Sequence, residues 1–341
     1  MQAIWLTKHG TGDVLEVRES ADPVPAATEV RVRVRFAGLN FAEISAKKGL
    51  YPDAPKPPCV LGYEGAGVVD AVGGEVRGVK VGDRVIYLSR FGAQADTVCV
   101  SESQIVPMPA AMSFEVGAAL PVNYLTAYHM LFRVARIRPH EHVLVHMAAG
   151  GVGTALLQLC RTIEGVVTYG TASAKKHAYV RSHGCAYPID YHTKDYVAEV
   201  RRLTEGRGVD LVLDALGGRD WQRGYDLLRP AGMLVCFGLA NTNAPGKRGI
   251  LRALRVLLQV PRFSGRALLD DNKGVAGVHI GHLWHEVELL REELAELVAL
   301  FERGAIEPHI HRVYPFSRAS EAWAEVEEGR SVGKVLLAPD A

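Results

Sequence analysis

The chain has 341 residues, of which 48% are hydrophobic and 23% are charged, and its formal net charge is +1 at pH 7. Length and composition are typical of a globular protein with two domains of ordinary size, and the near-neutral charge excludes a global field that would attract nucleic acid. The N-terminus shows no basic start followed by an apolar run, so we expect no signal peptide and a cytoplasmic protein. The five cysteines lie far apart and are expected to remain reduced.

The first 121 residues are predicted to be rich in β-strands that are separated by turns containing Gly and Pro. The stretch EVRVRVRFAG alternates apolar and basic residues, which is typical of a half-buried strand. Its two faces would carry Val30, Val32, Val34 and Phe36 on one side and Arg31, Arg33 and Arg35 on the other. The segments GYEGAGVVDAVG and VGDRVIYL continue the β pattern, and the C-terminal stretch ending in GKVLLAP returns to strand, helix and strand.

The stretch HVLVHMAAGGVGTALLQLC, from His142 to Cys160, contains no Asp, Glu, Lys or Arg after its first residue. Its apolar length approaches that of a short transmembrane helix, but a glycine cluster divides it. HVLVHM is short and β-branched like a buried parallel strand, whereas the following leucines have helical spacing as far as Gly165. A strand, a glycine turn and a helix form the unit at which a dinucleotide pyrophosphate binds backbone N–H groups.

The glycine turn AAGGVG, residues 148–153, matches the G-x-G-x-x-G pattern except that Ala148 occupies its first place. Gly150 would allow close approach to phosphate, and Gly153 would allow close packing of the helix on the strand. A strand–turn–helix without a ligand is the alternative. Further strands are predicted at 166–170, 208–218 and 232–241, with helices between them, which favours an α/β fold with a doubly wound parallel sheet of the Rossmann type.

The end of the second strand of this sheet decides the choice of cofactor. An NAD site usually carries Asp or Glu there, but no acid occurs between Gly165 and His177. Ser173, Lys175 and Lys176 follow instead, and hydroxyl and ammonium groups suit the 2′-phosphate of NADPH. The alternative is that these lysines are the solvated start of a helix.

The motifs LGYEGAGVV, VGDRV, LPVNYLTAYHML, VHMAAGGVGTALLQL, VDLVLDALGG and GKVLL occur in this order over nearly the whole chain. The chain thereby resembles the medium-chain dehydrogenase/reductase superfamily, in its zinc-free quinone oxidoreductase branch. The segments YGTASAKKH and PIDYHTKDY are most similar to the vesicle amine transport protein homologues of that branch. The resemblance implies a GroES-like catalytic domain at 1–123 plus 308–341, a Rossmann NADP(H)-binding domain at 124–307, and a homodimer.

Zinc-dependent relatives carry an early Cys ligand and a Gly-His-Glu motif. Asn40 and Gly62-Tyr63-Glu64 stand at these positions, and only Cys99 remains where a structural zinc loop would lie, so no metal is expected. Without a Lewis acid, hydride transfer to an activated C=C or quinone is favoured over alcohol oxidation. The substrate would be a quinone, an enone or an enoyl thioester such as enoyl-CoA.

The resemblance places Asn40 and Tyr51 in the substrate cleft as catalytic candidates, where each could donate a hydrogen bond to an enolate oxygen. The alternatives are a loop or helix-cap role for Asn40 and a rim position for Tyr51, while Glu43 is expected on the surface of a short helix. The cofactor-binding candidates are Asn123, Thr126, Ala149, Gly150, Gly151, Val152, Gly153, Gly170, Ser173, Lys176, Tyr191, Gly238 and Leu239.

The segment from Gly246 to Leu269 holds six basic residues and no acid. We interpret it as an amphipathic helix at a dimer interface, with a phosphate or CoA clamp and contact with an anionic membrane as alternatives. Two functions stay open. One is an NADPH-dependent reductase, and the other is a nucleotide-binding trafficking or scaffold protein with weak or no turnover.

Overall fold

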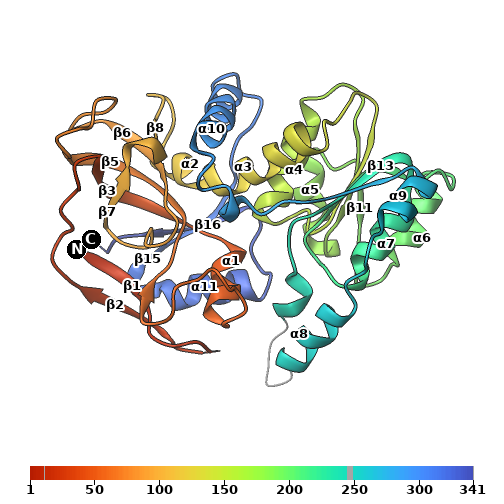
Figure 1. Cartoon of the computed structure of the whole chain (residues 1–341), viewed down its shortest axis with the longest axis horizontal. Coiled ribbons are helices and arrows are strands. Elements are labelled where there is room, and N and C mark those ends of the chain that lie inside the picture. Colours follow the sequence, from red (N-terminus) through yellow and green to blue (C-terminus); the bar gives the residue numbers. More distant parts are fainter. Residues whose placement is uncertain (11, 244–248, 341) are drawn as a thin grey trace. The chain divides into compact units, whose positions relative to one another are not determined.

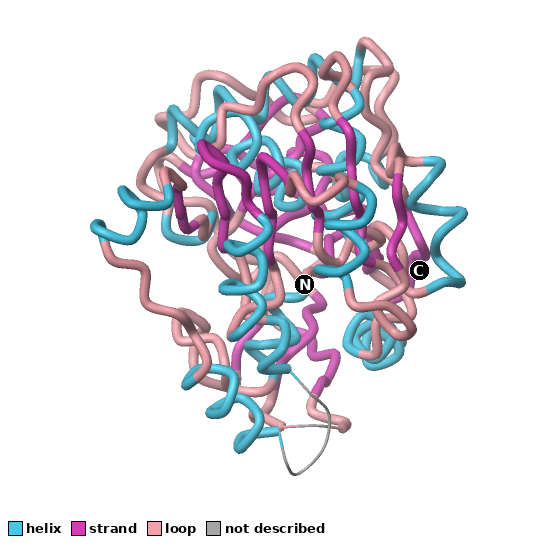
Figure 2. Tube along the Cα trace, turned by 90° about the vertical axis from the view of Figure 1, so that its right-hand side faces the viewer, coloured by secondary structure: helices cyan, strands magenta, loops and turns pink. Residues whose placement is uncertain are grey.

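The computed structural model describes residues 1–10, 12–243 and 249–340, and the chain divides into two units. Unit 1 comprises Met1–Leu125 and Ile280–Ala341, and unit 2 comprises Thr126–His279. Figure 1 labels the elements along the chain, and Figure 2 colours helices cyan and strands magenta. No helix among the described residues is both long and apolar enough to span a bilayer.

Unit 1 is built mainly from two β-sheets. One has the order β2-β1-β4, and the larger has the order β15-β16-β3-β5-β6-β8, with β7 also paired to β3. Its strands are β1 (Gln2–Leu6), β2 (Leu15–Glu19), β3 (Glu29–Leu39), β4 (Cys59–Val60), β5 (Glu64–Val72), β6 (Arg84–Leu88), β7 (Thr97–Ser101), β8 (Ile105–Pro107), β15 (Ile310–Pro315) and β16 (Lys334–Ala338). Its helices are α1 (Phe41–Lys47), η1 (Glu102–Gln104), α2 (Phe114–Ala119), η5 (Ile280–His282), α10 (Val287–Glu302), η6 (Phe316–Arg318) and α11 (Ala319–Glu327), and α3 (Pro121–Tyr128) crosses the unit boundary.

Strand β3 confirms the predicted alternation. Val30, Val32 and Val34 are buried, whereas Arg31 and Arg33 point outward and bind Asp70 on the neighbouring strand β5, over 2.8 and 2.6 Å. Opposite charges on adjacent strands stabilise the pairing. The alternation explains why this stretch forms a strand with one buried face.

The second predicted domain boundary is wrong. The prediction assigned residues 280–307 to the nucleotide-binding domain, but they belong to unit 1. Helix α10 packs on η1 and β8, and its buried Leu290 and Leu294 line a small hollow together with Val106 and Leu88. This apolar face could be placed only once its packing partner in the first 125 residues was known.

Unit 2 contains a six-stranded parallel sheet with the order β11-β10-β9-β12-β13-β14. In Figure 1, α4 and α5 lie on one side of this sheet and α6 and α7 on the other, which is the doubly wound arrangement that the sequence predicts. The strands are β9 (His142–Val145), β10 (Val167–Thr171), β11 (Tyr187–Ile189), β12 (Val209–Asp214), β13 (Leu228–Cys236) and β14 (Gly274–Gly277). The helices are η2 (His129–Val134), α4 (Gly151–Arg161), η3 (Ala174–Lys176), α5 (His177–Ser182), α6 (Tyr196–Leu203), α7 (Arg219–Leu227), η4 (Ala240–Asn243), α8 (Gly249–Leu258) and α9 (Gly265–Asp271).

Candidate functional site

The glycine turn of unit 2 joins β9 to α4 as predicted. Gly150 is the N-cap residue of α4, with extended backbone, so the first N–H groups of the helix point out of the turn. At Gly153 a Cβ atom would lie 2.4 Å from the carbonyl oxygen of Met147 and 2.7 Å from Cα of Ala148. Any side chain there would push the helix off the turn, and this close approach accounts for the glycine.

Several predicted cofactor residues follow the carboxyl ends of neighbouring parallel strands. Strands β10 and β12 both pair with β9, and β13 pairs with β12, so the loops after them meet at one edge of the sheet. The sheet thereby brings the glycine turn, Gly170, Ser173 and the Gly238–Leu239 pair to the same edge. Tyr191 follows β11, the outermost strand on that side, and is more than half exposed.

Ser173 precedes the short helix η3, and Lys176 is the last residue of that helix. Ser173 is buried at its N-cap position and Lys176 is half-buried. Burial, and then the adjacent Lys175, lower the pKa of Lys176. The expected helix start is therefore a 3-10 turn that brings one hydroxyl and one ammonium group to the end of β10.

Asn123 and Thr126 lie one turn apart on α3, which places both on one face of that helix. Asn123 is buried and Thr126 is half-buried. Gly238 and Leu239 follow β13 and pack against the turn after β12, because a Cβ at Gly238 would lie 2.9 Å from the carbonyl oxygen of Ala215.

The sequence reasoning missed a buried pair beneath the glycine turn. Nε2 of His146, at the end of β9, lies 3.7 Å from Oδ2 of Asp214, at the end of β12, and neither atom has a hydrogen-bond partner. Burial lowers the pKa of His146 and raises that of Asp214, so the uncharged forms are favoured. Thr171 Oγ1 lies 3.2 Å from both His146 Nδ1 and the N–H of Met147. The only signal in the sequence was a polar residue at the end of each of two buried strands.

Unit 1 contains a buried polar cluster around Asn40. Asn40 Nδ2 donates to Glu64 Oε1 over 2.8 Å, and its Oδ1 accepts from Lys334 Nζ over 2.6 Å. Lys334 also binds Glu64 directly, and the second Glu64 oxygen accepts from the N–H of Val122 over 2.6 Å. All three clustered side chains are buried. The cluster joins α1, β5 and β16, which lie far apart in the sequence.

Glu43 lies inside this cluster, and the surface position expected for it is wrong. It is fully buried on α1, and its Oε2 accepts from the backbone N–H of Asn40 over 2.7 Å. Burial is the main reason that its pKa is raised to about 8, with Lys334 opposing the shift and Glu64 adding to it. Helix α1 packs against α11, and its Ile44 and Ala46 belong to the adjoining apolar cluster, so most of this short helix is buried.

Tyr51 and Tyr63 lie next to this cluster. Tyr51 is partly buried against the apolar core, and burial raises its pKa to about 12. Tyr63 is almost fully buried, its ring lies 5.2 Å from that of Phe91, and burial followed by the charge of Glu43 raises its pKa. Each phenol influences the pKa of the other, yet Tyr63 Oη has no partner at hydrogen-bonding geometry.

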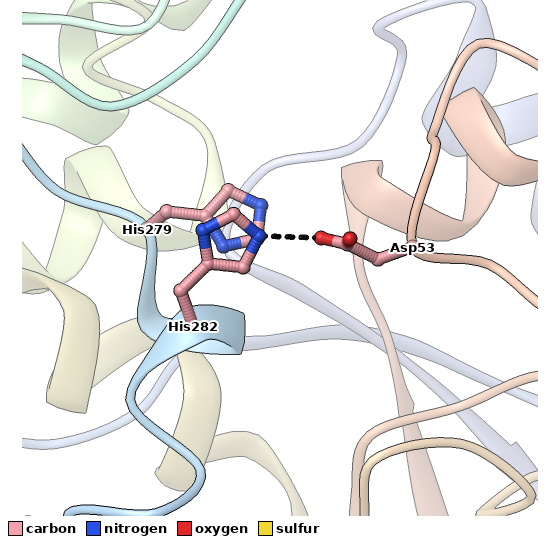
Figure 3. A group of neighbouring side chains, drawn as sticks. All are labelled: Asp53, His279 and His282. Carbon is pink, nitrogen blue, oxygen red and sulfur yellow. Dashed lines mark hydrogen bonds and ion pairs between the residues drawn. The ribbon is translucent and has the colours of Figure 1, made fainter.

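Asp53 lies two residues beyond Tyr51 and is linked to the second chain segment of unit 1. His282 Nε2 lies 2.6 Å from Asp53 Oδ2, and both side chains are partly exposed (Figure 3). The charge of Asp53 raises the pKa values of both Tyr51 and Tyr63. The charge of this partly exposed carboxylate therefore acts on both phenols.

The cluster does not fit a catalytic zinc. The ammonium group of Lys334 already lies against the Asn40 and Glu64 oxygens, and a divalent cation there would meet both its charge and its bulk. Tyr63 has a strongly raised pKa and offers a neutral phenol rather than an anionic ligand. Zinc prefers thiolate, imidazole and carboxylate donors.

The basic segment lies partly outside the described residues, since Gly246, Lys247 and Arg248 are not described. In the described part, α8 buries Ala253 and Val256 on unit 2, while the leucines expected on its packed face are exposed. Among the described side chains of this segment, the large exposed apolar ones are Leu251, Leu254, Leu257, Leu258 and Leu269. Arg252, Arg255, Arg262 and Arg266 are also exposed.

Two sequence families match the chain. The alcohol dehydrogenase GroES-like domain matches residues 26–110, and the family described as zinc-binding dehydrogenase matches residues 183–337. The first match lies within unit 1, and the second begins in unit 2 and ends at the last strand of unit 1. This agrees with the division of the chain, in which unit 1 is assembled from both chain segments.

Three relatives illustrate the similarity. The human synaptic vesicle membrane protein VAT-1 homolog is 46% identical over 99% of this chain and 86% of its own length. The Escherichia coli quinone oxidoreductase, solved in complex with NADPH, is 31% identical with a TM-score of 0.88 over 99% of this chain and 100% of that one. The CurK enoyl reductase is 28% identical with a TM-score of 0.84 over 99% of each chain. The chain therefore belongs to the medium-chain dehydrogenase/reductase superfamily, in its quinone oxidoreductase branch and close to the VAT-1 homologues.

Proposed function

We propose that this protein is an NADPH-dependent reductase that transfers hydride to an activated C=C bond or a quinone without zinc. The observation that carries the proposal is the glycine turn at the N-terminus of α4, with Ser173 and Lys176 at the end of the adjacent strand. Relatives described as a quinone oxidoreductase with NADPH and as an enoyl reductase support the reaction class.

The cofactor would supply the hydride, and the residues of unit 2 would hold it. Backbone N–H groups at the start of α4 suit the pyrophosphate, because they are unpaired in a helix and carry the positive end of its dipole. Ser173 and Lys176 would bind the 2′-phosphate through charge-assisted hydrogen bonds, with Tyr191 beside it. Asn123 and Thr126 stay predictions for contacts beside the cofactor, and Gly238 and Leu239 stay predictions for its nicotinamide end.

Tyr51 is proposed as the donor to the developing enolate or quinol oxygen. Its raised pKa keeps the phenol protonated at neutral pH, which is the form that donates. Asn40 donates one Nδ2 hydrogen to Glu64, and its Oδ1 accepts from Lys334. Only its second amide hydrogen could therefore donate to a substrate. We propose Asn40 as a secondary donor that also fixes the cluster.

A trafficking or scaffold role is the second candidate, and one observation favours it. Helix α8 exposes four leucines beside two arginines, and an apolar surface of this kind is unusual unless another surface covers it. Relatives described as synaptic vesicle membrane proteins agree with this alternative. Such a protein would bind the nucleotide but oxidise it slowly or not at all.

Following NADPH absorbance against a panel of quinones, enones and enoyl-CoA esters separates the two candidates. Turnover of one substrate class, lost in Gly153→Val because the helix must move off the turn, supports the reductase. Gly74→Val is the matched control, because a Cβ at this exposed turn position meets nothing and the backbone there does not have a positive φ. Tight NADPH binding with no oxidation of any panel member would overturn the reductase in favour of the scaffold.

A further inference from the structure

Two buried atoms beneath the glycine turn of unit 2 face each other without a hydrogen bond. His146 Nε2 and Asp214 Oδ2 lie 3.7 Å apart, both side chains are fully buried, and neither atom has a partner. Unpaired polar atoms are uncommon in a protein interior, because they lose hydrogen bonds to water and gain none. A shift of about 0.5–1 Å would let each of these atoms satisfy the other.

The His146 ring is tied to the glycine turn on its other side. Its Nδ1 lies 3.2 Å from Thr171 Oγ1, which also accepts a hydrogen bond from the N–H of Met147 over 3.2 Å. Met147 directly precedes the turn at 148–153, whose end is proposed to bind the pyrophosphate. The Tyr196 ring packs edge-on against the imidazole, with ring centroids 4.7 Å apart. The imidazole is therefore held in place relative to the glycine turn.

Asp214 shapes the turn that follows β12. Its Oδ1 accepts hydrogen bonds from the N–H groups of Leu216 and Gly217, over 2.6 and 3.1 Å. A Cβ at Gly217, where φ is +78°, would lie 2.5 Å from Leu239 Cδ2. The turn that Asp214 folds therefore lies directly against Leu239, one of the residues proposed for the nicotinamide end.

Backbone hydrogen bonds join the same turn to the segment after β13. The N–H of Phe237 donates to the carbonyl oxygen of Asp214 over 3.0 Å. The N–H of Ala240 donates to the carbonyl oxygen of Ala215 over 2.9 Å. Residues 238–239 lie between these two donors, so their position depends on the turn that Asp214 holds.

The protonation of the pair allows one hydrogen bond between its members. Burial lowers the pKa of His146 and raises that of Asp214, so the uncharged forms are favoured. Because Asp214 Oδ1 already accepts from two N–H groups, the acid proton belongs on Oδ2, where it faces Nε2 of the neutral imidazole. The other charged groups that act on the pair are Asp220 and Arg223 of α7.

We propose that His146 and Asp214 are positioning residues for NADPH, a role that rests on the cofactor contacts of the proposed function. A dinucleotide that contacts both turns favours the arrangement in which the ends of β9 and β12 lie closer together, and Asp214 then donates to His146 Nε2. This bond fixes residues 238–239 relative to the glycine turn. Both side chains act through the turns that they hold rather than through contact with the cofactor.

His146→Phe tests this link with two ligands. Phe keeps an aromatic ring beside Tyr196 but offers Asp214 no acceptor. NADPH should bind about tenfold more weakly, which is the effect of one lost hydrogen bond. Adenosine 2′,5′-bisphosphate should bind nearly as tightly as it does to wild type, because it has no nicotinamide half to reach residues 238–239. Calorimetric titration measures both affinities.

His142→Phe is the matched control, because it makes the same substitution at the other end of the same strand. His142 Nδ1 lies 2.9 Å from the Tyr169 hydroxyl, far along β9 from the glycine turn. This variant should bind both ligands as wild type does. Asp214→Asn is the conservative variant, since its amide keeps an oxygen for the turn and an N–H for His146. It should retain NADPH affinity.

NMR of isotope-labelled histidine side chains in wild type gives a readout that depends on neither turnover nor a disruptive variant. NADPH should shift the Nε2 signal of His146, because this nitrogen gains a hydrogen bond, whereas adenosine 2′,5′-bisphosphate should leave it in place. Asp214→Asn, which changes the donor that faces this nitrogen, identifies the signal.

Four results would overturn the positioning role. They are an unchanged NADPH affinity in His146→Phe, an equal loss for both ligands in that variant, a loss in Asp214→Asn as large as in His146→Phe, and a His146 signal that ignores NADPH. Each of them can be observed while wild type binds NADPH. A wild type that does not bind NADPH would instead overturn the proposed function, and the positioning role with it.

Discussion

Lys334 on the last strand of the chain donates a hydrogen bond to the side chain of Asn40, 294 residues earlier, over 2.6 Å. The same ammonium group neutralises the buried carboxylate of Glu64. The two ends of the chain are thus joined inside unit 1 by a charge pair in which both partners are buried.

Removing this ammonium group should destabilise the protein strongly. Lys334→Met leaves Glu64 buried without a countercharge, which typically costs about 3–5 kcal/mol in the free energy of unfolding. Lys194→Met breaks an exposed pair with Glu199 and should cost less than about 1 kcal/mol. Urea unfolding of both variants checks the difference, and similar losses would contradict the assigned importance of the cluster.

Glu43 should make stability fall as pH rises. Its folded-state pKa is about 8 and its ordinary value 4.5, so between these pH values the folded state holds a proton that the unfolded chain has released. A difference of one pKa unit between the folded and unfolded states corresponds to ~1.4 kcal/mol in the free energy of unfolding. Glu43→Gln should therefore gain stability over wild type by on the order of a few kcal/mol as pH rises from 4.5 to about 8. Urea unfolding at several pH values measures this, and parallel curves would show that Glu43 is ionised when folded.

The nucleotide preference should depend on Lys176. NADPH is expected to bind at least about tenfold tighter than NADH, because the ammonium group of Lys176 and the hydroxyl of Ser173 would bind the 2′-phosphate that NADH lacks. Lys176→Ala should reduce the difference in affinity between NADPH and NADH and leave NADH binding nearly unchanged. Lys175→Ala, which removes the exposed neighbouring lysine, should reduce this difference less. Calorimetric titration of wild type and both variants with each nucleotide measures these affinities. Equal affinities in wild type would contradict the assignment.

The protein should work without bound metal. Elemental analysis of purified protein should find no stoichiometric zinc, and a chelator should leave turnover and Tm unchanged. The reason is that the ammonium group of Lys334 and the phenol of Tyr63 lie in the region where zinc ligands would be needed. One tightly bound zinc ion per chain would contradict the prediction that the protein works without metal.

The exposed arginines after α8 should affect only phosphate-bearing substrates. Neutralising Arg262 and Arg266 together should raise KM for enoyl-CoA esters severalfold, while KM for a small quinone should hardly change. The effect should weaken with added salt because exposed charges are screened. Neutralising Arg181 and Arg201, exposed on other helices, is the control. An equal loss for both substrate types would instead indicate a role in folding or assembly.

The sequence by itself determined the features that depend on local backbone geometry. Alternating Val and Arg can bury one face only as a strand, and β3 does so. The glycine turn between an apolar strand and a leucine-rich helix predicted β9 and α4, because only glycine permits the close approach found at residue 153. The strand at 232–241 was placed too late, since pairing with β12 begins it at Leu228.

Tertiary structure alone decided which distant groups meet. Nothing local to Glu43 showed that Lys334 and Glu64 would surround it, and exposure on a short helix was the natural expectation. The same holds for His146 with Asp214 and for α10, whose apolar face fits β8 of the other chain segment. Periodicity is a property of neighbouring residues, whereas burial and charge pairing depend on the packing of segments that the chain brings together only when it folds.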